Sequence, residues 1–126
     1  MICLAFDNYD WGCSYLLHDE TNYKINRIEI GPNKKLSYQF HKHRTEIWTI
    51  IDGEGLVTLN DEKFILNRGD CIQIPKGAIH KIENTLAQKL IFIEIQTGKE
   101  LNAKDVVEID EDQVAFDEFG RNTVKE

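Results

Sequence analysis

Short β-type segments separated by turn residues run through most of the chain, and this pattern constrains the fold more than any other feature. The segments are rich in Ile, Val, Tyr, Phe and Thr and are bounded by Gly, Pro, Asn or Asp. We expect strands at Ser14–His18, Tyr23–Ile30, Leu36–His41, Glu46–Ile51, Leu56–Leu59, Lys63–Leu66, Cys71–Ile74, His80–Glu83 and Leu90–Gln96. No segment before residue 100 shows a helical period, so the pattern predicts an all-β sandwich or closed barrel.

The length limits this fold to one domain. A chain of 126 residues suffices for one hydrophobic core, so we expect a single domain over residues 1–126. We place its barrel core at about residues 13–98 and a short C-terminal extension at 99–126, where Leu101–Ile109 forms one more strand or a short helix. The extension is acidic, because residues 100–126 carry nine acidic and three basic side chains.

Composition excludes several classes of function. The net charge of −7 argues against a nucleic-acid partner, because contacts to phosphates need a basic surface. No apolar run approaches the roughly 20 residues that span a bilayer, and the first residues lack the features of a signal peptide. The three cysteines form no CxxC pair, which indicates neither a disulfide framework nor a cysteine metal site. We therefore expect a cytoplasmic protein without a membrane partner.

The segment from Gln39 to Glu46 carries the chemistry. Side chains alternate between the faces of a strand, so Gln39, His41 and His43 would share one face. Imidazole, carboxylate and carboxamide groups that converge on one face suit a divalent metal ion better than an apolar core.

Two spaced motifs resemble those of the cupin superfamily, which are small antiparallel jelly-roll barrels. The first is Gln39-x-His41, then Glu46 and Gly53, and the second is Gly69, Pro75-x-Gly77, His80 and Asn84. In the usual first motif two histidines flank one residue, and here Gln39 takes the place of the first. The resemblance implies a cupin-type antiparallel jelly-roll β-barrel.

The same resemblance implies a metal site formed by Gln39, His41, Glu46 and His80. His43 is the alternate ligand, in which case Gln39 would hydrogen-bond outside the coordination sphere. Two imidazoles, a carboxylate and an amide oxygen favour Zn, while Mn, Fe, Ni or Co also suit such a mixed site.

A narrower resemblance covers nearly the whole chain and is to the type II mannose-6-phosphate isomerase cupin domain. The segments that carry it are Trp11-Gly12, Tyr23–Ile28, Leu36–Trp48, Ile74–His80, Ile93–Gly98, Asp105–Val107 and Phe119–Arg121. This resemblance implies metal-dependent aldose–ketose isomerisation of a phosphorylated hexose.

Basic residues supply the remaining roles that this resemblance implies. Lys24, Arg27, Arg44 and Arg121 are candidates for holding the substrate phosphate, since arginine can do so through two hydrogen bonds. Lys35 is a candidate general base, with a metal-bound water as an equal alternative. The candidate catalytic set is therefore Lys35, Arg44 and Arg121.

Other interpretations stay open at this point. Tyr9-Asp10 and Glu108 stand where the isomerase family has basic residues. The chain could instead be a non-catalytic metal-binding cupin that binds a sugar or a nucleotide-sugar, or another metal-dependent cupin enzyme such as a dioxygenase or an epimerase. Exposed β edges are expected in such a barrel, and they make a homodimer plausible.

Overall fold

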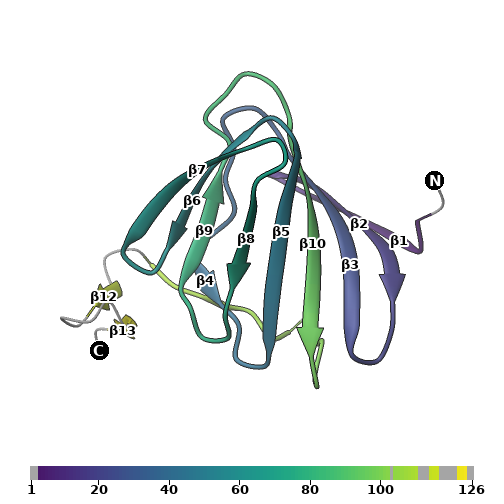
Figure 1. Ribbon diagram of the computed structural model, residues 1–126, viewed down its shortest axis with the longest axis vertical. Coiled ribbons are helices and arrows are strands. Elements are labelled where there is room, and N and C mark those ends of the chain that lie inside the picture. Colours follow the sequence, from purple (N-terminus) through teal and green to yellow (C-terminus); the bar gives the residue numbers. More distant parts are fainter. Residues whose placement is uncertain (1–2, 103, 111–113, 117–121, 125–126) are drawn as a thin grey trace.

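Two antiparallel sheets that face each other form the body of the protein (Figure 1). The computed structural model describes residues 3–102, 104–110, 114–116 and 122–124. Its strands are β1 (Ala5–Tyr9), β2 (Gly12–Asp19), β3 (Tyr23–Ile30), β4 (Gln39–Phe40), β5 (Arg44–Asp52), β6 (Glu54–Leu59), β7 (Glu62–Asn67), β8 (Cys71–Ile74), β9 (His80–Glu83), β10 (Leu90–Gly98), β11 (Val107–Glu108), β12 (Val114–Phe116) and β13 (Asn122–Val124).

The strand order confirms the predicted jelly-roll barrel. One sheet has the order β1-β2-β3-β10-β5-β8 and the other the order β11-β4-β9-β6-β7, while β12 and β13 pair with each other. From β3 to β5 and from β7 to β10, the chain crosses from one sheet to the other at each step. Such crossings make neighbours of strands that are distant in sequence, such as β3 and β10. Among the residues described, no helix is long and apolar enough to cross a membrane.

All nine expected strands are present, and three local differences have physical causes. The sequence pattern missed β1, whose five residues are all exposed and so lack an inward-facing hydrophobic set. The strand expected at Leu36–His41 is reduced to Gln39–Phe40, because the chain bends at Tyr38 before these two residues and at Lys42 and His43 after them. In the segment where we expected one more strand or a short helix, Val107–Glu108 form the short strand β11, which pairs with β4.

The hydrophobic core lies between the two sheets, towards one end of the barrel. Its buried members are Ile28, Ile30, Trp48, Ile50, Val57, Leu66, Ile74, Ile82, Leu90 and Phe92. The rings of Trp48 and Phe92 pack together in this core with centroids 5.1 Å apart. At the other end of the barrel the inward-facing side chains are polar, and these build the candidate site.

Candidate metal centre

Three buried side chains from separate segments converge inside the barrel. His41 follows β4, Glu46 lies on β5 and His80 begins β9. Each offers one ligand atom, and these atoms all lie within 4.8 Å of one another. The three residues are 3%, 1% and 2% exposed. The structure therefore brings together three of the four predicted metal ligands.

Backbone carbonyl groups orient both histidines toward the centre of this cluster. Nδ1 of His41 lies 2.7 Å from the carbonyl oxygen of Asp105, and Nδ1 of His80 lies 2.9 Å from that of Ala78. A carbonyl oxygen only accepts, so both Nδ1 atoms donate and both Nε2 atoms keep a lone pair. Carbonyl partners of this kind commonly orient metal-binding histidines.

Both histidines are held in the neutral form that binds a metal. Burial lowers the pKa of His80 to about 4, with smaller effects from His41 and Arg44. Burial and the charge of Arg44 also lower the pKa of His41. A buried set of two imidazoles and one carboxylate fits Zn²⁺ and similar divalent ions, which His41, Glu46 and His80 would hold.

The segment after β10 fixes the turn that carries His41. The Asp105 carboxylate accepts hydrogen bonds from the backbone N–H groups of Lys42 (2.9 Å) and His43 (2.8 Å). Burial acts to raise the pKa of Asp105, but these two donors outweigh it and hold the pKa below its usual value. On the other side, the N–H of Gly77 donates to the carbonyl oxygen of His41 at 2.8 Å. Gly77 has φ = +77°, so the Pro75–Gly77 turn favours glycine at this position.

Glu46 accepts hydrogen bonds from two donors on its own strand. Its Oε1 accepts from the indole Nε1 of Trp48 at 3.0 Å, and its Oε2 accepts from Nε of Arg44 at 2.7 Å. Oε2 also lies 3.2 Å from Nε2 of His41. Arg44, Glu46 and Trp48 all point inward because alternate residues of a strand share one face. We expected this strand to begin at Glu46, but β5 begins at Arg44 after bends at Lys42 and His43, which is why Arg44 belongs to this inward set.

The two remaining candidate ligands occupy different places. Gln39 lines the same cavity of about 40 Å³ as His41, Glu46 and His80. Its amide nitrogen donates to the carbonyl oxygen of Ser37 at 3.2 Å, so coordination through its amide oxygen stays a prediction. His43 lies outside the cluster, with a side chain 53% exposed and Nε2 3.9 Å from the Glu100 carboxylate.

Glu94 on β10 is a candidate functional residue that the sequence interpretation missed. Its Oε1 accepts hydrogen bonds from Asn26 (3.1 Å) and Gln96 (2.7 Å). Burial and the nearby Glu46 raise the pKa of Glu94 to about 7. The available signal was the alternation in Phe92-x-Glu94-x-Gln96, which places two polar side chains on the inward face of a strand.

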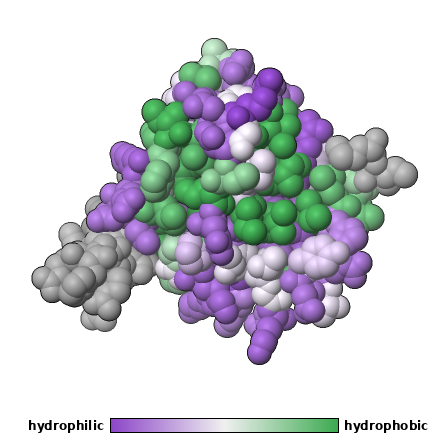
Figure 2. Space-filling view, viewed as in Figure 1, coloured by the Kyte–Doolittle hydropathy of each residue, from purple (hydrophilic) through white to green (hydrophobic). Residues whose placement is uncertain are grey.

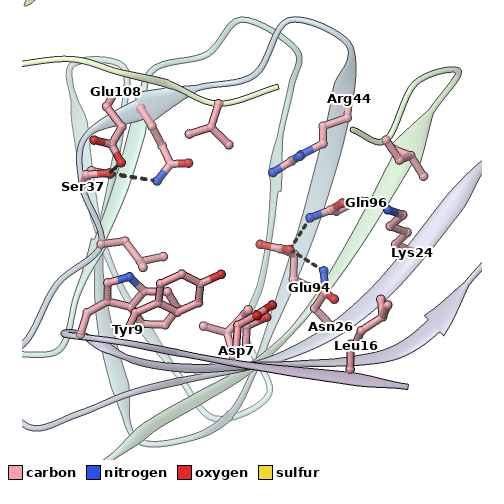
Figure 3. Close-up of a pocket in the computed structure, with 18 residues that line it drawn as sticks. Asp7, Tyr9, Leu16, Lys24, Asn26, Ser37, Arg44, Glu94, Gln96 and Glu108 are labelled. Atoms are coloured by element: carbon pink, nitrogen blue, oxygen red, sulfur yellow. Dashed lines mark hydrogen bonds between the residues drawn. The ribbon is translucent and has the colours of Figure 1, made fainter. Parts of the chain in front are cut away.

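A larger pocket of about 400 Å³ adjoins the cluster (Figure 3). Glu94 and Arg44 line both this pocket and the small cavity, and Figure 3 shows both side chains pointing into the space. The other charged residues on its wall are Asp7, Lys24 and Glu108. Tyr9 and Trp11 close one side, with their rings stacked at 4.7 Å and an interplanar angle of 8°.

The other predicted basic residues are dispersed. Lys24 lines the large pocket, with Nζ 4.0 Å from Asp19. Arg27 lies on the opposite face of β3, where it covers the ring of Tyr15 at 5.4 Å and pairs with Glu29 at 3.0 Å. Lys35 is exposed and bridges to Glu83 through its backbone, away from both cavities. Arg121 lies outside the described residues.

Comparison with known proteins gives a family match over most of the chain. Residues 6–111 match the family described as mannose-6-phosphate isomerase C-terminal. A putative mannose-1-phosphate guanylyltransferase from Vibrio cholerae is 39% identical over 101 residues, which are 80% of this chain and 22% of that protein. The chain thus spans about a fifth of the length of the curated relatives it matches.

Solved structures with the same fold include a cupin and a sugar-phosphate protein. The cupin domain of Cnp3 from Schizosaccharomyces pombe superposes with a TM-score of 0.63 at 16% identity, covering 68% of this chain and 64% of that one. A putative sugar phosphate isomerase from Acidithiobacillus ferrooxidans has a TM-score of 0.56 at 26% identity, covering 60% of this chain and 50% of that one.

Proposed function

Because the chain belongs to the family of mannose-6-phosphate isomerase C-terminal domains, we propose that it is a metal-dependent aldose–ketose isomerase of a phosphorylated hexose. The candidate reaction interconverts mannose 6-phosphate and fructose 6-phosphate. The observation that carries this proposal is the position of Glu94, a buried carboxylate on the wall shared by the His41–Glu46–His80 cluster and the large pocket.

Glu94 is the proposed general base, in the role for which Lys35 was the sequence candidate. It would take the proton from C2 of the aldose and return it to C1, while a hydroxyl proton moves between O1 and O2. Asn26 and Gln96 hold its carboxylate by hydrogen bonds from one side, which fixes its direction relative to the pocket. A divalent ion held by His41, Glu46 and His80, with Zn²⁺ proposed and Mn²⁺, Fe²⁺, Ni²⁺ or Co²⁺ as alternatives, would supply Lewis acidity toward the sugar oxygens.

The phosphate is proposed to bind Lys24 and Arg44, which line the large pocket. Both side chains can donate charge-assisted hydrogen bonds to phosphate oxygens. Arg27 faces away from this pocket and has no part in the proposed site. The assay is direct: the purified protein is incubated with each metal and mannose 6-phosphate, and fructose 6-phosphate is measured. We expect turnover that EDTA abolishes and added metal restores, and absence of turnover with every metal would refute the proposal.

A second candidate function is a non-catalytic metal-binding cupin that binds a sugar or a nucleotide-sugar. The charge of the large pocket favours a neutral sugar over an anionic ligand, because Asp7, Glu94 and Glu108 face only two basic residues there among those the structure describes. The stacked rings of Tyr9 and Trp11 also offer an apolar surface for a sugar or a base. In this case neutral sugars or nucleotide-sugars would raise the melting temperature without turnover.

We also propose that two copies of the chain pair through the outer face of the six-stranded sheet. Isoleucines 47, 51, 93 and 95 point outward there from β5 and β10, and Figure 2 shows hydrophobic residues gathered on this face. Arg27 and Glu29 are neighbours on this sheet and already pair with each other at 3.0 Å. A second copy could therefore cover the face without leaving these charges unpaired. Light scattering would give twice the monomer mass, and Ile93→Glu would restore the monomer.

A further inference from the structure

The guanidinium of Arg44 contacts two of the acceptor atoms that the cluster would offer to an ion. Its Nε lies 2.7 Å from Oε2 of Glu46, and its Nη2 lies 3.5 Å from Nε2 of His41. Arg44 is only 7% exposed, so this positive charge lies beside the carboxylate in a region shielded from water. A divalent ion at the same two atoms would meet a second cation at close range. Arg44 and an ion therefore compete for Glu46.

The large pocket, in contrast, offers an anion little uncompensated positive charge. Among the described residues that line it, only Lys24 and Arg44 are basic. Nζ of Lys24 lies 4.0 Å from Asp19, and the guanidinium of Arg44 is engaged by Glu46. The facing carboxylates of Asp7 and Glu94 would repel an anionic ligand. An anion would gain a partner here if Arg44 left Glu46.

The position of Arg44 allows such a movement without rearrangement of the sheets. It is the first residue of β5 and lines both the small cavity and the large pocket. Figure 3 shows its long side chain reaching from the strand into the open space above Glu94. Rotation about side-chain bonds is therefore sufficient to turn the guanidinium from Glu46 toward the pocket.

We infer that Arg44 couples ion binding in the cluster to anion binding in the large pocket. Without an ion, Arg44 neutralises Glu46 and leaves the pocket unsuited to a phosphate. An ion that binds Glu46 releases the guanidinium, which then binds the anionic group of a ligand in the pocket. Thermodynamic linkage requires that the anion strengthen ion binding by the same factor. The inference takes only the anionic character of the ligand from the proposed function.

Ion binding with and without an inorganic dianion tests this coupling. Protein stripped of metal with EDTA is titrated with Zn²⁺, and separately with Mn²⁺, against a chromophoric chelator. Sulfate serves as the dianion because it does not precipitate these metals, and sodium chloride gives the matched ionic strength. We expect sulfate to tighten ion binding to the wild-type protein by about fivefold or more.

Arg44→Met removes the competing charge, so it should bind the ion about tenfold or more tightly without sulfate. Sulfate should then have no further effect. Arg44→Gln, which keeps a donor for Glu46 without the charge, should give the same result if the methionine variant does not fold. Arg27→Met is the matched control, since it removes an arginine paired with Glu29 on the outer side of β3, and should behave as wild type.

Unchanged or weaker ion binding in both Arg44 variants would overturn the inference, as would a sulfate effect that persists in them. Failure of the proposed isomerase activity would be seen in the turnover assay, which is independent of these ion titrations. If the coupling is measured but no hexose phosphate is converted, Arg44 links the two sites in a protein that only binds its ligand.

Discussion

The two ends of the barrel interior differ in polarity, although the same strands build both. Inward-facing residues at the polar end are Asn26 on β3, Arg44 and Glu46 on β5, His80 on β9, and Glu94 and Gln96 on β10, whereas those at the apolar end are Ile28, Ile30, Trp48, Ile50, Ile82, Leu90 and Phe92. Trp48 marks the boundary, with its ring packed on Phe92 and its indole N–H donating to Glu46.

This difference shows how stability and function are divided within one small barrel. Burial of hydrocarbon at the apolar end removes surface from water and favours folding. Burial of charged groups at the polar end costs free energy that their mutual hydrogen bonds only partly offset. The free energy gained by burial at the apolar end therefore offsets the cost of burying charge at the polar end. Substitutions at the apolar end should mainly lower stability, and those at the polar end should mainly change activity or ion binding.

The largest loss of stability is expected at the apolar end. Phe92 is completely buried, so Phe92→Ala should lower the free energy of unfolding by about 3–5 kcal/mol through lost burial and a remaining cavity. Urea unfolding measures this change. Ile65→Ala, at an isoleucine of β7 that is 62% exposed, is the control and should cost clearly less. Equal losses for the two variants would contradict the division.

At the polar end, Glu94→Gln should affect turnover and leave the fold intact. Loss of the proposed general base should reduce kcat by about 10²–10⁴-fold. The amide keeps the shape of the carboxyl group and removes a buried acid, so the melting temperature should not fall. Assays of kcat and thermal unfolding on the same preparation check both statements. A fully active Glu94→Gln variant would exclude Glu94 as the base.

In metal-free protein, His80 and Glu94 should give opposite pH dependences of stability. The pKa of His80 is lowered from 6.5 to about 4, so between these values the unfolded chain binds a proton that the folded protein does not, and stability falls as the pH falls. The pKa of Glu94 is raised from 4.5 to about 7, so the folded protein keeps a proton that the unfolded chain has lost, and stability falls as the pH rises.

Variants separate these two opposing effects. Relative to wild type, Glu94→Gln should become more stable as the pH rises through the range 4.5 to 7, by up to roughly 3 kcal/mol. The stability of His80→Gln relative to wild type should fall as the pH rises from 4 to 6.5, because the variant lacks the histidine that destabilises wild type at low pH. Urea unfolding at several pH values in EDTA measures both. Parallel pH profiles for wild type and both variants would show that neither group titrates as the polar end requires.

The smallest effect is expected from Asp105, which contacts the polar end from outside. Asp105→Ala removes the acceptor for the Lys42 and His43 N–H groups and so loosens the turn that carries His41. Affinity for Zn²⁺ should fall by about 10-fold, the lower end of the range for lost partners of metal ligands, because the Asp105 carbonyl that accepts from Nδ1 of His41 remains. Asp61→Ala, on the exposed turn between β6 and β7, is the control. Unchanged Zn²⁺ affinity in Asp105→Ala would show that the turn holds His41 without this carboxylate.

Much of this arrangement could be predicted from local sequence. Alternation and turn residues predicted nine strands, and the resemblance to the cupin motifs implied that His41, Glu46 and His80 would meet, as they do in the buried cluster. The bend after Phe40 was not predicted, because polar residues such as Lys42 and His43 suit both an edge strand and a turn. Their conformation depends on Asp105, which lies more than sixty residues later in the chain.

The sequence by itself determined the all-β fold class, because strand period and turn chemistry act between near neighbours, and its resemblance to the cupin motifs indicated three of the cluster's side chains. Only the tertiary structure showed that Glu94 lies on the wall shared by cluster and pocket, that Arg44 contacts Glu46, and that Arg27 and Lys35 face elsewhere. The physical reason is that pairing between distant strands decides which charged groups become buried neighbours, and burial in turn decides their pKa values and partners.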